Sequence, residues 1–210
     1  MKYSVLFCCA VFLSSPAKAA PGDFEAGVRA FFAADMTKAL AAWDRQLVDE
    51  PEEKPQHWQR GLALYYAGKF KEGRGQFEVH QKVNPQDVEN AAWHFLCVAR
   101  LENVAAARQA FIPITADPRV PMKEIHALFA GKGTEETVLT AANAAADPDN
   151  LRNQRCYAHL YLGLYHEALG DAAKAKEHLT KAAGEFKMDH YMGRVAQVHV
   201  KLREWAAATP

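Results

Sequence analysis

The stretch that decides the fold is KPQHWQRGLALYYAGKFKEGRGQFEVHQKVNPQD, residues 54–87. It predicts a pair of helices, because two segments with helical periodicity are separated by a glycine turn. Gly61 and Gly73 allow the two helices to approach closely, and Gly68 supplies the positive φ that ends the first helix. Pro85 cannot continue the second helix and therefore ends the unit.

The same arrangement recurs with a period of about 34 residues. Counted from residue 20, the chain places Gly27, Ala34, Trp43 and Pro51 where residues 54–87 have two glycines, a phenylalanine and a proline. We expect regular units over 20–53, 54–87, 88–121 and 156–188, a degenerate unit over 122–155 and a capping helix over 189–207. The pattern resembles the tetratricopeptide repeat, which implies an all-α fold, a right-handed superhelix (α-solenoid) with a C-terminal capping helix.

The composition favours one folded domain over residues 20–210. The chain has 210 residues, half of them hydrophobic, and its 25 basic residues equal its 25 acidic ones. A chain of this size and hydrophobic content can bury a substantial core. We expect no nucleic-acid partner, because proteins that bind phosphate backbones normally carry a basic excess.

Residues 1–19 have the pattern of a signal peptide. Lys2 is followed by an apolar run from Val5 to Leu13, and Ala17-Lys18-Ala19 is a small-x-small cleavage signal. The sequence therefore predicts an exported protein, periplasmic or secreted, with no stable membrane insertion, since the apolar run is short for a bilayer span. An uncleaved N-terminal anchor is the alternative interpretation.

The first helices of the repeats are expected to line a concave surface. The residues predicted to bind a partner there are Phe31, Phe32, Trp58, Leu62, Tyr65 and Tyr66. Aromatic side chains with polar tips bury a large area at low entropic cost and are common in grooves that bind a peptide or a helix. Two alternatives stay open: the terminal helix or the irregular middle segment fills the groove, or a homodimer covers it.

The runner-up function is binding of a metal or small ligand by His94, Cys97, Cys156 and His159. Residues three apart on a helix share a face, so each His–Cys pair offers one nitrogen and one sulfur ligand. A disulfide between the cysteines and two separate buried thiols are the other interpretations. His159 and His166, seven residues apart, also share one helical stripe, which gives a ligand or pH-sensing role as a further hypothesis.

Catalysis is not expected from this sequence. It contains no phosphate-binding glycine loop, HExxH or GxSxG motif, and no nucleophile motif surrounds Cys97 or Cys156. A hydrolase with a site near His159 and His190 is the third hypothesis, and it requires a cysteine or carboxylate within hydrogen-bond reach of either histidine. We therefore predict a protein without enzymatic activity and without a cofactor.

The strings RGLALYY, residues 60–66, and YLGLY, residues 161–165, resemble the NlpI-type bacterial envelope tetratricopeptide proteins. The likeness extends over about residues 56–183. It implies an all-helical, often dimeric adaptor without catalysis of its own, which recruits envelope hydrolases or proteases. The chain lacks a lipid-accepting cysteine at the predicted cleavage site.

Overall fold

The computed structural model describes residues 22–205, and all of its regular structure is helical. The helices are α1 (Asp23–Phe32), α2 (Met36–Asp49), the 3₁₀ helix η1 (Pro51–Gln56), α3 (Trp58–Tyr66), α4 (Phe70–His80), α5 (Val88–Leu101), α6 (Val104–Gln109), α7 (Met122–Phe129), α8 (Glu135–Ala142), α9 (Pro148–Ala168), α10 (Ala172–Ala183) and α11 (Tyr191–Leu202). The all-α prediction is confirmed. The predicted signal peptide lies outside the described residues.

The helices that are neighbours in sequence pack against each other in pairs. In the α3–α4 pair, a Cβ placed on Gly61 would lie 2.6 Å from Cζ of Phe77, so only glycine allows this approach. The equivalent contacts in two other pairs are Gly27 with Trp43 and Gly163 with Leu179. In all three pairs the glycine and the large residue that it meets are separated by the same number of positions in sequence, and the arrangement is compatible with an α-solenoid.

The turn between paired helices is also alike in three pairs. Ala34, Gly68 and Gly170 follow α1, α3 and α9, and all three have a positive φ, between 65° and 82°. This left-handed residue ends the first helix and reverses the chain. Asp35 and Asp171 then cap α2 and α10, each accepting a hydrogen bond from the backbone N–H three residues later.

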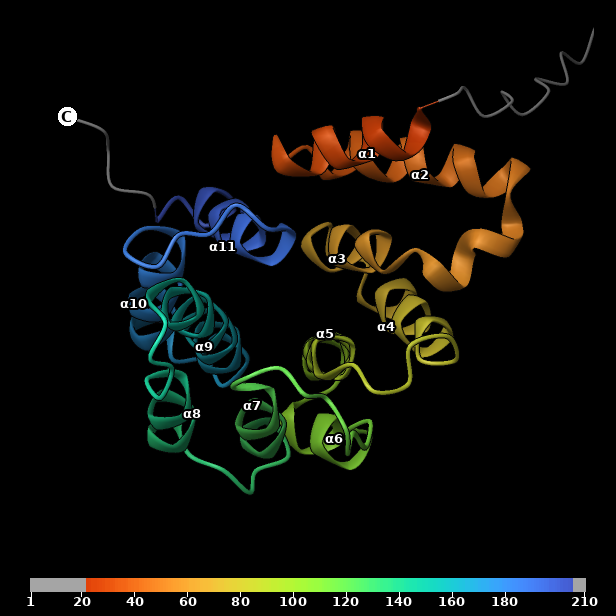
Figure 1. The fold of residues 1–210 in the computed structure, drawn as a ribbon. Coiled ribbons are helices and arrows are strands. Elements are labelled where there is room, and N and C mark those ends of the chain that lie inside the picture. The colour runs from red at the N-terminus through yellow and green to blue at the C-terminus, as the bar shows by residue number, and fades with distance from the viewer. Residues whose placement is uncertain (1–21, 206–210) are drawn as a thin grey trace, which may run out of the picture.

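The helices follow an arc that returns on itself, so that α11 lies beside α1 and α3 (Figure 1). The Tyr191 ring is 4.7 Å from the Phe32 ring and 4.7 Å from the Trp58 ring, measured between centroids. Lys201 Nζ also donates to the Ala33 carbonyl at 2.9 Å. The C-terminal helix therefore packs on the final pair and also closes the arc against the first helices.

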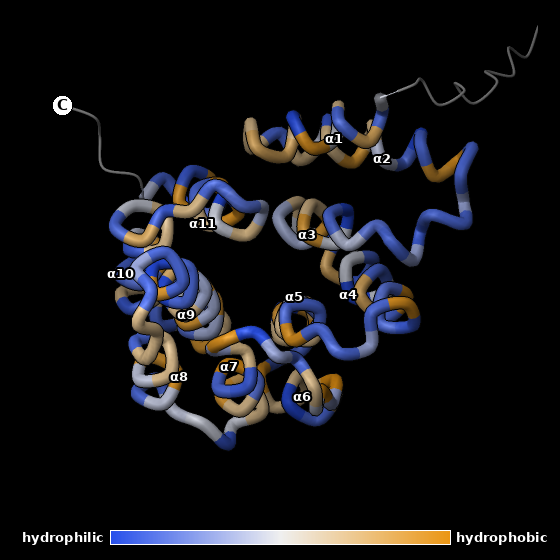
Figure 2. The backbone as a smooth tube through the Cα atoms, viewed as in Figure 1, coloured by the Kyte–Doolittle hydropathy of each residue, from blue (hydrophilic) through white to orange (hydrophobic). Residues whose placement is uncertain are grey.

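The core runs between the helices around the whole arc. Hydrophobic residues recur along each helix, whereas the connection from α2 to α3 is almost entirely hydrophilic (Figure 2). Trp43, Trp93 and Tyr161 are among the largest fully buried side chains, and they come from α2, α5 and α9. No described helix combines the length and the apolar character that a membrane span requires.

Candidate functional site

The six residues predicted to bind a partner lie near one another, but half of them are buried. Phe31, Leu62 and Tyr65 are buried. The other three, Phe32, Trp58 and Tyr66, are partly exposed. Tyr191 of α11 contacts the rings of Phe31, Phe32 and Trp58. The N-terminal part of the predicted groove is thus occupied by the chain's own last helix.

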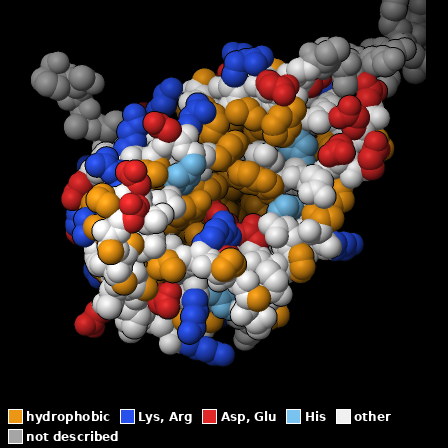
Figure 3. All heavy atoms as spheres, viewed as in Figure 1, with side chains coloured by type: hydrophobic (Ala, Val, Ile, Leu, Met, Phe, Trp, Pro, Cys, Tyr) orange, Lys and Arg blue, Asp and Glu red, His pale blue; other side chains and the backbone are white. Residues whose placement is uncertain are grey.

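A pocket of about 370 Å³ remains open at the centre of the arc, and we call it the central pocket. Figure 3 shows this hollow with hydrophobic side chains on its walls and charged groups of both signs at its base. Of the six predicted residues, only Trp58 and Leu62 line it. The full lining is Trp58, Leu62, Phe77, His80, Asp87, Glu89, Asn90, Trp93, Arg119, Tyr157, His190, Tyr191 and Met192.

The walls of the central pocket are aromatic and come from four different helices. Trp58, Trp93, Tyr157 and Tyr191 lie on α3, α5, α9 and α11. The rings of Trp58 and Tyr191 meet edge to face at 4.7 Å. Tyr157 stacks on the ring of His190 at 5.1 Å. Aromatic faces carry negative electrostatic potential, so these walls favour an apolar or cationic group.

The base of the pocket is a charged cluster around Arg119. One guanidinium nitrogen of Arg119 contacts Asp87 Oδ1 and Asp117 Oδ2, each at 2.6 Å, and the other contacts the carboxylate of Glu89. Tyr161 donates its hydroxyl to Glu89 Oε2 at 2.6 Å. Three carboxylates therefore share one guanidinium.

The irregular segment 110–121 brings Arg119 to this position. The backbone N–H groups of Thr115 and Ala116 donate to Gln86 Oε1 at 3.0 and 2.9 Å. The N–H of Val88 donates to Asp117 Oδ2 at 3.1 Å, so an aspartate of this segment binds the first turn of α5. These bonds hold the segment across the N-terminus of α5, next to the pocket.

The electrostatics of the cluster are governed by burial. Burial raises the pKa of the Glu89 carboxyl to about 7, with the neighbouring Asp87 acting in the same direction and Arg119 opposing both. Burial lowers the pKa of His190, which favours its neutral form. The carboxylates outnumber the guanidinium, so the base of the pocket is acidic.

Several residues of the lining have hydrogen-bonding capacity that the rest of the described chain does not use. Trp93 Nε1, Asn90 Oδ1, His190 Nε2 and the Tyr191 hydroxyl are buried without a partner among residues 22–205. Buried polar groups are nearly always hydrogen-bonded, to protein, water or a ligand. The pocket therefore offers donors and acceptors as well as charge and aromatic surface.

The four residues of the predicted metal or small-ligand site do not come together. His94 Nε2 lies 3.4 Å from Glu78, and His159 Nδ1 lies 2.8 Å from His178 Nδ1. Cys97 and Cys156 are buried free thiols, so the interpretation as two separate buried thiols is confirmed. Burial raises the pKa of both thiols, that of Cys156 to about 12, which keeps them protonated and unreactive.

Sequence reasoning missed Glu89 and Arg119. Glu89 has one visible signal, because it lies four residues before Trp93 and so shares its helix face. Arg119 belongs to a segment without helical periodicity, and its approach to Asp87 and Glu89 depends on the path of that segment. No protein-family model matches this chain.

Proposed function

We propose that this chain is an exported, non-enzymatic binding protein of the tetratricopeptide-repeat class, which holds a basic side chain of a partner peptide in the central pocket. The observation that carries the proposal is the combination of four aromatic walls with an acidic base in one open hollow. The proposal includes three features that the sequence predicts: a right-handed repeat superhelix, export and a role as an adaptor.

The chemistry of the pocket favours a cation. An ammonium or guanidinium group is attracted to the faces of tryptophan and tyrosine, and the attraction grows when water is excluded. Asp87 and Glu89 at the base supply carboxylate oxygens for charge-assisted hydrogen bonds, which are stronger than neutral ones. An anionic group would instead meet carboxylates that outnumber the single guanidinium of Arg119.

The size of the pocket favours a single side chain over a helix. Its volume of about 370 Å³ is near the lower end of the range of small-ligand sites. A partner helix would need the neighbouring surface at Phe31 and Phe32, where Tyr191 already packs. A peptide that inserts one lysine or arginine needs only the central opening. Envelope hydrolases or proteases are the partner class that the sequence resemblance suggests.

A peptide-binding assay tests this proposal. Labelled peptides with a central lysine, arginine, norleucine or glutamate are titrated with the protein and followed by fluorescence anisotropy. We expect binding of the lysine or arginine peptides in preference to the norleucine peptide. At about pH 8, above the Glu89 pKa of about 7, Glu89→Gln should weaken that binding about tenfold, because it removes a charge-assisted hydrogen bond worth about 1.5 kcal/mol.

Two further variants separate the pocket from general effects. Trp58→Ala removes an aromatic wall and should weaken the basic peptides, whereas Glu72→Gln changes an exposed glutamate of α4 outside the pocket lining and should not. Equal affinity for the lysine and norleucine peptides would refute the proposal. So would equal effects of Glu89→Gln and Glu72→Gln, with both variants folded by circular dichroism.

A further inference from the structure

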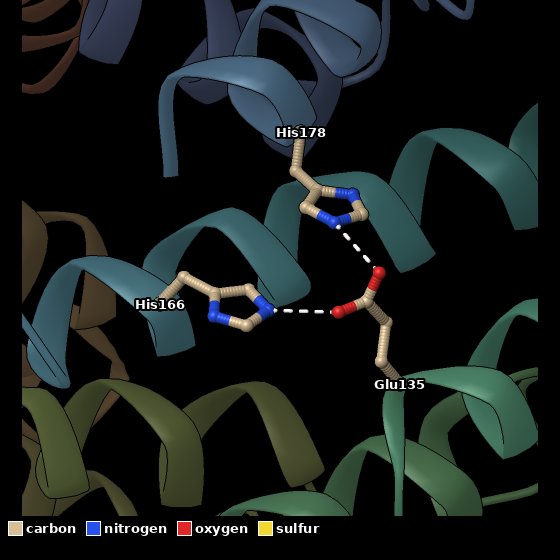
Figure 4. Close-up of side chains that lie close together, drawn as sticks. All are labelled: Glu135, His166 and His178. Carbon is tan, nitrogen blue, oxygen red and sulfur yellow. Dashed lines mark hydrogen bonds and ion pairs between the residues drawn. The ribbon is translucent and has the colours of Figure 1, made fainter. Parts of the chain in front are cut away.

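A second cluster of ligand-type side chains lies where α8, α9 and α10 meet. Glu135, His166 and His178 come from these three helices and point toward one another (Figure 4). His166 Nε2 is 3.0 Å from Glu135 Oε2, and His178 Nε2 is 3.2 Å from Glu135 Oε1. One ligand atom from each residue lies within 4.8 Å of the others, and among residues 22–205 no other trio of His, Cys, Asp or Glu does so.

We propose that Glu135, His166 and His178 bind a divalent transition metal ion of the zinc class. Zinc takes imidazole nitrogens and carboxylate oxygens at about 2.0–2.2 Å, so tetrahedral ligand atoms lie roughly 3.3 Å apart. The two nitrogen–oxygen separations, 3.0 and 3.2 Å, are close to that spacing, and each histidine nitrogen faces a different oxygen of the Glu135 carboxylate. Two histidines and one carboxylate leave a fourth position for water or another ligand.

The surroundings of His178 fit a ligand role. A histidine that binds a metal through one nitrogen usually donates its other ring N–H to a nearby acceptor, which orients the ring. The second nitrogen of His178, Nδ1, lies 2.8 Å from Nδ1 of His159. His159 is itself held between this contact and the ring of Phe186, which stacks on it at 5.1 Å. His178 is buried, so its ring orientation is fixed by packing.

Lys174 lies beside the cluster and would compete with a bound metal for the carboxylate of Glu135. Its Nζ lies 3.0 Å from Glu135 Oε2, and its side chain is half exposed. An open hollow lined in part by Glu135, Leu139 and Lys174 gives access from solvent. When a divalent cation binds Glu135 and replaces its ion pair with Lys174, the lysine side chain can rotate into this hollow.

The position of the cluster predicts what a bound metal would do. Glu135 lies on α8, whereas His166 and His178 lie on α9 and α10, which pack against each other as a pair. A metal would therefore join two units that otherwise meet through side-chain packing and hydrogen bonds. A ligand that binds only the folded state raises the free energy of unfolding by mass action. The site should act as a structural link with an open coordination position.

Calorimetric titration with ZnCl₂ tests the site on the full chain after removal of metals with a chelator and dialysis. We expect one zinc ion per chain, a higher melting temperature with zinc, and visible d–d absorption of a four-coordinate site with Co²⁺. His166→Gln and His178→Gln should each weaken zinc binding at least tenfold. Lys174→Ala should tighten it several-fold, because it removes the competing cation without touching the ligands.

The matched control is His94→Gln, which disrupts a histidine–glutamate pair elsewhere, where His94 faces Glu78 without a second histidine ligand. It should leave zinc affinity unchanged. A stoichiometry well below one, or equal affinity in the parent, His166→Gln and Lys174→Ala proteins, would overturn the proposal. Since Lys174 is a surface residue, its variant stays folded and informative even if a histidine variant does not fold.

Discussion

Replacing Glu89 with glutamine tests the electrostatics at the base of the central pocket. The amide keeps an acceptor for the Tyr161 hydroxyl but loses the ability to ionise. Glu89 is a buried carboxyl on α5 whose pKa is raised by burial from 4.5 to about 7. The titratable or charged groups that face it are Asp87, Asp117, Arg119, Cys156, Tyr157 and Tyr161.

The raised pKa sets the sign and the size of the effect. Below pH 4.5 both the folded and the unfolded chain hold the proton, so Glu89 adds no pH dependence. Between pH 4.5 and about 7 the folded state keeps a proton that the unfolded chain has lost, so stability falls as pH rises. At about 1.36 kcal/mol per pKa unit, the parent should lose about 2.5 kcal/mol relative to Glu89→Gln between about pH 5 and about pH 8.

Urea unfolding of both proteins at several pH values, followed by circular dichroism, measures this difference directly. Titrating groups distant from Glu89 contribute equally to the two curves, so only the difference is interpreted. Glu72→Gln, an exposed glutamate of α4, is the control and should follow the parent at every pH. A flat difference curve would refute the raised pKa. A parent that gains stability relative to Glu89→Gln with rising pH would mean that Arg119 holds Glu89 ionised.

Two further changes test the packing. Gly61→Ala should destabilise the fold by about 1–2 kcal/mol, because its Cβ would overlap Phe77, whereas Gly75→Ala, which meets nothing within 4 Å, should stabilise α4 by about 0.5–1 kcal/mol. Thermal unfolding of the pair checks this, and stabilisation by Gly61→Ala would contradict it. Tyr66→Phe should cost about 1–2 kcal/mol in urea unfolding, since it leaves the buried His199 Nδ1 without its 3.1 Å partner; an unchanged midpoint would show that this contact contributes nothing.

The helix pairs were predictable because their packing is local and periodic. Gly61 and Phe77 are separated by one turn between paired helices, so their complementary sizes appear at fixed spacing in the sequence. The degenerate unit 122–155 also contains a local signal, because Thr134 caps α8 through a capping box with Thr137, three residues later. These features can be predicted from residues that are close in sequence, without knowing how distant segments pack.

The pocket and the histidine cluster were not predictable in the same way. Tyr191 reaches Trp58 only because the arc of helices returns on itself and brings α11 beside α3 (Figure 1). Arg119 approaches Glu89 from a segment without periodicity. His166 was placed on one stripe with His159, but its partner Glu135 lies on another helix, and no spacing rule connects the two.

The return of α11 to α1 makes the first and last described helices neighbours. Repeat proteins with free ends fold as nearly one-dimensional arrays, in which the terminal units fray independently. Here Lys201 of α11 donates to the carbonyl of Ala33, which follows α1 and lies 168 positions away in sequence, so the first and last described helices share their protection from opening. Hydrogen exchange in α1 should therefore accelerate when the chain is truncated before Tyr191. Such long-range closure also raises the contact order, which should slow folding.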